Sequence, residues 1–146
     1  MRCAIGRGGL TRNKREGDGA TPRGSRQILG WLFRPHPAGP PRGALPARAI
    51  RRDAGWCDAP ASGAYNRPVR LPFAASCEEL WRADGKYDAV GVLDYNIRPR
   101  RKGAGSAIFF HIADADYGPT AGCLAVSAAD MRKLTARLAR RAIVRV

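Results

Sequence analysis

Short apolar runs recur along the second half of the chain, separated by clusters of glycine, proline and charged residues. Ala89–Leu93, Ala107–Ile112 and Cys123–Val126 each hold consecutive apolar residues with β-branched or aromatic members, which is typical of buried strands. Arg26–Phe33 shows the same mixture earlier in the chain, and Ile143–Val146 predicts a closing strand. Met1–Leu10 mixes apolar residues with glycine and predicts a further short strand.

Two segments carry helix signals instead. Ser127 is a suitable N-cap for a helix from about Ala128 to Arg140, whose apolar residues lie three and four apart and so share one face: Met131, Leu134 and Leu138. Ser76–Glu79 has the Ser-x-x-Glu capping-box pattern and predicts a short second helix. Strands dominate and do not alternate regularly with helices, so we expect a mostly antiparallel β domain with a helix packed on one side.

Prolines and glycines interrupt the pattern in the middle of the chain. Five prolines between positions 35 and 46 exclude regular structure over about a dozen residues. We expect this region, through 56–73, to be a long ordered loop or flap, and such loops are often functional. Nearer the start, Asp18-Gly19 indicates a tight turn, because glycine supplies the positive φ that such turns need. The length of 146 residues fits a single domain, residues 1–146.

The charge is strongly unbalanced, with 26 Lys+Arg against 12 Asp+Glu and a net charge of +14. Residues 1–52 hold 12 basic and 2 acidic side chains, so the excess is concentrated at the front. A positive charge of this size favours the binding of polyanions such as nucleic acid, anionic lipid or acidic wall polymers. The alternative is that the chain is simply rich in arginine and has no dedicated anionic partner. A non-catalytic, polyanion-binding module therefore stays open. Nucleic acid is the less favoured partner, since no aromatic residues are interleaved with the arginine clusters.

Targeting and cofactor signals are scarce. No stretch approaches the ~20 apolar residues of a transmembrane helix, and the N-terminus lacks the apolar core of a signal peptide, which predicts a cytoplasmic protein if the chain starts at Met1. The cysteines form no C-x-x-C pair and there are only two histidines, so we expect no metal site and no cofactor. Whether Cys3, Cys57 and Cys77 form a disulfide is left open.

His111 and Cys123 are the candidate reactive pair. His111 closes one apolar run and Cys123 opens the next, with an eleven-residue connection between Ile112 and Gly122. Adjacent strands joined in this way can bring their ends together. A thiol needs a base to become a nucleophilic thiolate, and imidazole is such a base. Gly122 would let backbone amides approach a reacting carbonyl. The alternative is that both are ordinary core residues, as free cysteines often are.

Two separated motifs resemble the signature of the L,D-transpeptidase catalytic domain family (YkuD/ErfK-like). Thr120–Cys123 reads Thr-Ala-Gly-Cys and matches three of four positions of the family's Ser/Thr-His-Gly-Cys motif, which follows a strand-borne histidine. Gly17–Gly24 is similar to the family's Gly-Asp-Gly-x-Thr-Pro-x-Gly stretch. The chain departs from the family at Ala121, which replaces the motif histidine, at Ala125, where an arginine is frequent, and in a shorter His–Cys spacing.

The resemblance implies a mostly β fold, an antiparallel β-sandwich or barrel-like catalytic domain with one or two helices packed on it. It also implies an enzyme of peptidoglycan and cell-wall biogenesis. Cys123 would be acylated by a donor stem peptide, with His111 as general base and acid and the Ile112 carbonyl orienting the imidazole. Backbone amides around Gly122 and Cys123 would hold the oxyanion, and an acceptor stem would resolve the acyl-enzyme. Hydrolysis instead would make the same pair an L,D-carboxypeptidase.

The resemblance also implies a location in the cell envelope or periplasm, where anionic envelope polymers are further possible partners. Three residues near the pair are candidate substrate contacts, because amide, phenol and hydroxyl groups can hold a peptide: Tyr95, Asn96 and Thr120.

Overall fold

A central sheet of six strands organises the chain. The computed structural model describes residues 1–36, 39–137 and 139–146. The central sheet has the order β10-β9-β8-β3-β11, with β4 paired to β3 as well. Its strands are β3 (Ser25–Phe33), β4 (Ala47–Ala49), β8 (Ala89–Leu93), β9 (Phe109–Ile112), β10 (Leu124–Val126) and β11 (Ile143–Arg145). The strands predicted from the apolar runs are therefore present, within a few residues at their ends.

Antiparallel pairing joins β3 to β8 and to β11, and β8 to β9. The pair β9–β10 is parallel, with Leu124 beside Phe110 and Ala125 beside His111. The connection between these two strands crosses over instead of forming a hairpin, so both strands run in the same direction. The register, and not a meeting of strand ends, decides where Cys123 lies relative to His111.

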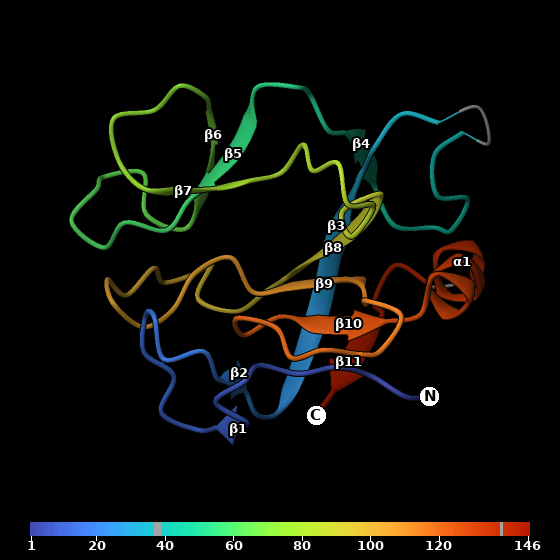
Figure 1. The fold of residues 1–146 in the computed structure, drawn as a ribbon, viewed down its shortest axis with the longest axis horizontal. Coiled ribbons are helices and arrows are strands. Elements are labelled where there is room, and N and C mark those ends of the chain that lie inside the picture. Colours follow the sequence, from blue (N-terminus) through green and yellow to red (C-terminus); the bar gives the residue numbers. More distant parts are fainter. Residues whose placement is uncertain (37–38, 138) are drawn as a thin grey trace.

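A second, three-stranded antiparallel sheet has the order β6-β5-β7. It consists of β5 (Ala54–Cys57), β6 (Arg67–Arg70) and β7 (Cys77–Glu79), and Figure 1 shows it above β9 and β10 in that view. The region predicted to be a long loop thus contains strands. The helix predicted at Ser76–Glu79 is wrong, because Cys77–Glu79 pairs with Gly55–Cys57, and this cross-strand pairing outweighs the local capping pattern.

The N-terminal segment lies against the central sheet without forming the predicted strand at Met1–Leu10. Isolated bridges join Ala4 to Ala125 and Gly6 to Thr120. A small parallel pair follows, β1 (Leu10–Thr11) with β2 (Thr21–Pro22). These contacts bring the Gly17–Gly24 motif beside the Thr120–Cys123 motif, although about a hundred residues separate the two in sequence.

One helix is present in the described part of the chain, α1 (Ala128–Arg137). Ser127 caps it as predicted, because its Oγ accepts the Asp130 N–H at 3.1 Å. The helix ends before the predicted Arg140, and Leu138 lies outside the described residues. No helix in the described ranges is long and apolar enough to cross a membrane.

Buried apolar side chains form one cluster on each face of the central sheet. Phe110, Leu124 and Met131 belong to the cluster that packs under α1. Phe109, Cys123 and Tyr87 belong to the cluster under the second sheet. Because neighbouring strand residues point to opposite faces, His111 lies on the same face as Phe109 and Cys123.

Candidate functional site

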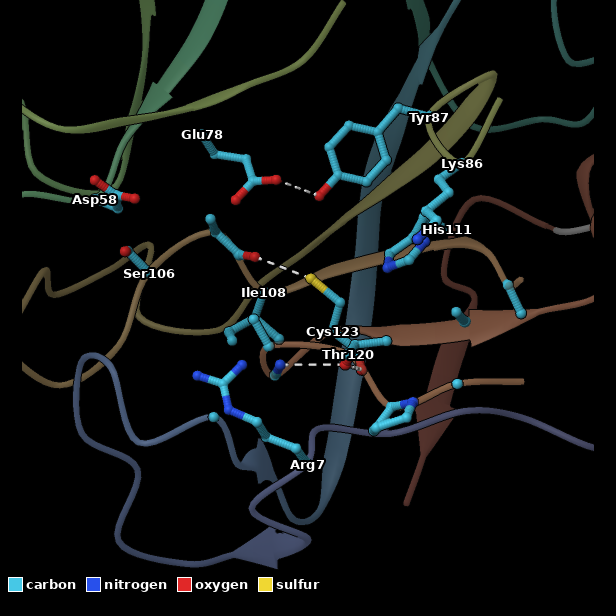
Figure 2. Close-up of a pocket in the computed structure, with 18 of the residues that line it drawn as sticks. Arg7, Asp58, Glu78, Lys86, Tyr87, Ser106, Ile108, His111, Thr120 and Cys123 are labelled. Atoms are coloured by element: carbon cyan, nitrogen blue, oxygen red, sulfur yellow. Dashed lines mark hydrogen bonds between the residues drawn. The ribbon is translucent and has the colours of Figure 1, made fainter. Parts of the chain in front are cut away.

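His111 and Cys123 line the same cavity, which has a volume of about 370 Å³. The cavity lies between the central sheet, the second sheet and the N-terminal segment. Figure 2 shows the Cys123 sulfur and the His111 ring facing it, with Tyr87 and Glu78 on one side and Arg7 on the other. In the register of β9 and β10, His111 is opposite Ala125, so Cys123 lies two residues before the histidine along the sheet.

The imidazole of His111 is held by two neighbours. Its Nδ1 lies 2.8 Å from the carbonyl oxygen of Ile112, so a neutral ring donates Nδ1–H there and leaves the Nε2 lone pair free. The ring of Tyr87 packs edge-on against it, with 5.3 Å between ring centroids. Burial lowers the pKa of His111, and the charge of Lys86 acts in the same direction, whereas the bond to Ile112 opposes this. The ring is therefore neutral near pH 7.

The thiol of Cys123 is also neutral. Its side chain is buried, the Sγ–H donates to the Ala107 carbonyl at 3.2 Å, and Sγ accepts the Phe109 N–H at 3.4 Å. Burial raises the pKa of Cys123 to about 12, although the Phe109 N–H and the charge of Lys14 partly offset that effect. Both groups line the same cavity, and no hydrogen bond joins the thiol to His111 in the described structure.

Two threonines fix the loop in front of Cys123. Thr120 Oγ1 accepts the Gly122 N–H at 3.1 Å and donates to the Cys123 carbonyl at 2.7 Å. Thr21 is fully buried; its Oγ1 accepts the Gly6 N–H at 2.8 Å and donates to the Gly122 carbonyl at 2.9 Å. The hydroxyl of Thr120 and the amide of Gly122 are thus both occupied within the loop.

The candidate contacts Tyr95 and Asn96 do not line this cavity. Tyr95 donates its hydroxyl to the Ala104 carbonyl at 2.8 Å. Asn96 donates to the carbonyls of Arg101 and Gly105 and accepts the Arg101 N–H, at 2.8–2.9 Å. Both side chains therefore hold together the basic loop that follows β8.

Several polar residues of the cavity were not identified from the sequence. Lys14 is buried and forms an ion pair with Asp18. Glu16 accepts hydrogen bonds from the hydroxyls of Tyr65, at 2.5 Å, and Ser106, at 2.7 Å. The Gly17–Gly24 motif was the one feature of the sequence that pointed to this part of the cavity wall, because Lys14 and Glu16 lie just before it. The surrounding segment is mostly charged, which is typical of an exposed loop, so the sequence gave no indication that these two side chains line a cavity.

Glu78 and Tyr87 form a further polar pair above the sulfur. The Tyr87 hydroxyl donates to Glu78 Oε1 at 2.8 Å. Burial raises the pKa of Tyr87, and the nearby Cys123 and Glu78 add to this rise, so the phenol stays protonated. Within the described ranges, no group of three or more His, Cys, Asp or Glu side chains could hold a metal ion.

Comparison with protein-family models gives one match, which covers residues 1–146. The matching model is YkuD, the L,D-transpeptidase catalytic domain. No curated protein and no solved structure matches the chain.

Proposed function

The chain belongs to the L,D-transpeptidase catalytic domain family, and on that premise we propose that it cross-links peptidoglycan stem peptides through Cys123 and His111. The observation that carries the proposal is that both side chains line one cavity on one face of the sheet, with the imidazole Nδ1 engaged by the Ile112 carbonyl. That engagement leaves Nε2 as the atom that can take a proton.

The acylation step begins from the neutral pair. The thiol leaves the Ala107 carbonyl and gives its proton to Nε2 of His111, while Sγ attacks the carbonyl carbon of the donor stem. The tetrahedral intermediate then collapses, the carbon–nitrogen bond breaks, and the imidazolium returns the proton to the departing amine. An oxyanion that accepts the Gly122 N–H replaces Thr120 Oγ1 as its partner.

The second step resolves the thioester. An amine of the acceptor stem attacks the acyl carbon, and its proton passes by way of Nε2 to the departing sulfur. A new amide is formed and the Cys123 thiol is restored. Since both substrates are wall peptides, we propose that the protein acts in the cell envelope.

Acylation is tested by intact-protein mass spectrometry with a carbapenem, which acylates enzymes of this kind. We expect one covalent adduct on the wild type and none on Cys123→Ala. Cys3→Ser is the matched control, because it removes an exposed thiol and should still form the adduct. An adduct that persists unchanged in Cys123→Ala refutes the assignment.

Product analysis separates transfer from hydrolysis. With a donor and an acceptor stem present, we expect cross-linked dimer from the wild type and none from His111→Ala. Free shortened stems without any dimer would instead assign the same pair to an L,D-carboxypeptidase.

A further inference from the structure

Arg7 is the one cationic side chain of the cavity wall without a carboxylate partner in the described part of the chain. Four cationic residues line the cavity: Arg7, Lys14, Arg82 and Lys86. Three of them are neutralised by ion pairs: Lys14 with Asp18, Arg82 with Asp84 and Glu78, and Lys86 with Asp114 at 2.8 Å. The guanidinium of Arg7 is therefore outside the described ion pairs, as are two carboxylates of the same wall, Glu16 and Asp58.

The backbone fixes Arg7 beside the nucleophile loop. Its N–H donates to the Thr120 carbonyl at 2.9 Å, and Gly6 forms a bridge with the same threonine. The side chain lies over Gly19, where an added Cβ would be 2.9 Å from the Arg7 Cγ. The absence of a side chain at Gly19 thus leaves room for Arg7, and Figure 2 shows its guanidinium directed toward the cavity.

We propose that Arg7 binds the carboxylate of the amino acid that leaves when the donor stem acylates Cys123. This inference rests on the proposed function. The leaving residue directly follows the scissile carbonyl, so its carboxylate lies only a few bonds from the carbon that Sγ attacks. The backbone of Arg7 is held at Thr120, three residues before Cys123, and we infer that its long side chain reaches that carboxylate. A guanidinium offers a planar pair of N–H donors that matches a carboxylate.

The test compares two synthetic donor stems that differ only at the C-terminus, one a free carboxylate and the other a primary carboxamide. Mass spectrometry measures the rate of Cys123 acylation by each. We expect the wild type to prefer the carboxylate by about 10- to 100-fold, as a charge-assisted hydrogen bond implies, and Arg7→Gln to reduce that ratio to about 1. Arg12→Gln is the matched control, because Arg12 is exposed and outside the cavity wall; it should keep the ratio.

The outcomes separate the two proposals. Equal rates of acylation of the wild type by both donors, or a preference that survives in Arg7→Gln, overturn the role of Arg7 while the proposed function stands. Acylation of the wild type by neither donor is instead a failure of the proposed function.

An independent observation concerns Cys57 and Cys77, which are directly opposite each other on β5 and β7. The neighbouring hydrogen bonds, Asp58 N–H to the Ser76 carbonyl at 3.2 Å and Leu80 N–H to the Ala54 carbonyl at 3.0 Å, make Cys57 and Cys77 a non-hydrogen-bonded pair. Such pairs have Cα atoms about 4.5 Å apart with side chains on the same face. This separation lies within the range that a disulfide requires.

Cys57 also acts on the thiol of Cys77, and the residue that follows each cysteine lines the cavity. Burial raises the pKa of Cys77, and the adjacent Cys57 raises it further. Asp58 follows Cys57 and Glu78 follows Cys77, and both line the cavity. We infer that Cys57 and Cys77 form a disulfide when a disulfide oxidant is present. The bond would hold β7 against β5 and so hold Glu78, which follows Cys77, in the cavity wall. The two thiols lose two electrons and two protons, and the oxidant is reduced to two thiols.

The test incubates the full chain with oxidised glutathione or with a reductant, then alkylates it under denaturing conditions and measures its mass. We expect two fewer alkylated cysteines after oxidation, a peptide linking positions 57 and 77, and a Tm higher by about 10 °C, because the bond closes a loop of about 20 residues. Cys57→Ser should abolish all three changes, and Cys3→Ser should retain them. Glutathione adducts on Cys57 and Cys77, or a bond between other cysteines, would overturn the inference.

Discussion

Replacing Thr21 by valine removes the hydroxyl that ties the nucleophile loop to the N-terminal segment. Thr21 is fully buried. Its Oγ1 accepts the Gly6 N–H at 2.8 Å and donates to the Gly122 carbonyl at 2.9 Å. Valine has nearly the same shape as threonine, so the change deletes the two hydrogen bonds without opening a cavity.

The cost follows from the two groups left without a partner. A buried donor or acceptor that loses its hydrogen bond costs about 1–3 kcal/mol. Gly6 N–H and the Gly122 carbonyl are both affected, so we expect Thr21→Val to lower the free energy of unfolding by about 2–4 kcal/mol. For a domain of this size this is a fall in Tm of about 6–12 °C.

Urea denaturation followed by tryptophan fluorescence measures the effect, because Trp31 and Trp56 are both buried. Thr21→Ser is the matched control: it keeps the hydroxyl and loses one methyl group, for about 1 kcal/mol. We also expect slower carbapenem acylation in folded Thr21→Val. The Gly122 carbonyl loses its hydrogen bond to Thr21, so the loop just before Cys123 is held less firmly. If Thr21→Val is as stable as Thr21→Ser, the hydroxyl does not hold the loop and the reasoning fails.

Three further predictions test other parts of the molecule. Alkylation of native Cys123 by iodoacetamide should keep accelerating up to about pH 12, because burial raises the pKa of its thiol to about 12. In the unfolded state the Cys123 thiol has a pKa near 8.5, so above that pH it loses its proton in the unfolded state first. The free energy of unfolding should therefore fall by about 1.4 kcal/mol per pH unit up to the folded pKa. Urea titrations of Cys123→Ala should lack this fall. Gly6→Ala should unfold the chain, since its Cβ would lie 2.1 Å from the Gly19 carbonyl oxygen, whereas Gly63→Ala meets nothing within 4 Å and should leave the Tm nearly unchanged. Tyr95→Phe should lose about 1 kcal/mol with its hydrogen bond to Ala104 but keep the carbapenem acylation rate within about twofold, because Tyr95 is outside the cavity.

Local sequence patterns predicted the elements that local physics determines. The apolar runs at Arg26–Phe33 and Ala107–Ile112 are strands, and Ser127 caps the helix that follows. The pattern at Ser76–Glu79 failed because its strand depends on a partner, Gly55–Cys57, twenty residues away. A four-residue capping signal cannot report such a distant partner.

The polar wall of the cavity could not be predicted for the same reason. Lys14 lies in a charged segment that resembles a solvated loop. It is nevertheless buried, because Asp18 neutralises it and two separate segments, around Gly105 and around Gly122, pack against its side chain. Tyr95 and Asn96, predicted as substrate contacts, do not line this cavity, and their polar groups are engaged by the backbone of their own loop. Lys14 is thus contacted by distant segments and the other two side chains by their own loop, and in neither case does the residue type alone report the contact.

The meeting of the two motifs also explains how the chain accommodates its departures from the family pattern. Gly122 has φ +140°, and a Cβ there would lie 3.0 Å from the Ala20 carbonyl oxygen, so the N-terminal motif packs directly on the nucleophile loop and requires a glycine at that position. Ala121 is exposed, so the loss of the motif histidine does not disturb this packing. Ala125 is fully buried and exchanges backbone hydrogen bonds with Ala4, at 2.7 and 3.0 Å. These backbone hydrogen bonds hold the N-terminal segment against β10, and the same segment carries Arg7 into the cavity wall.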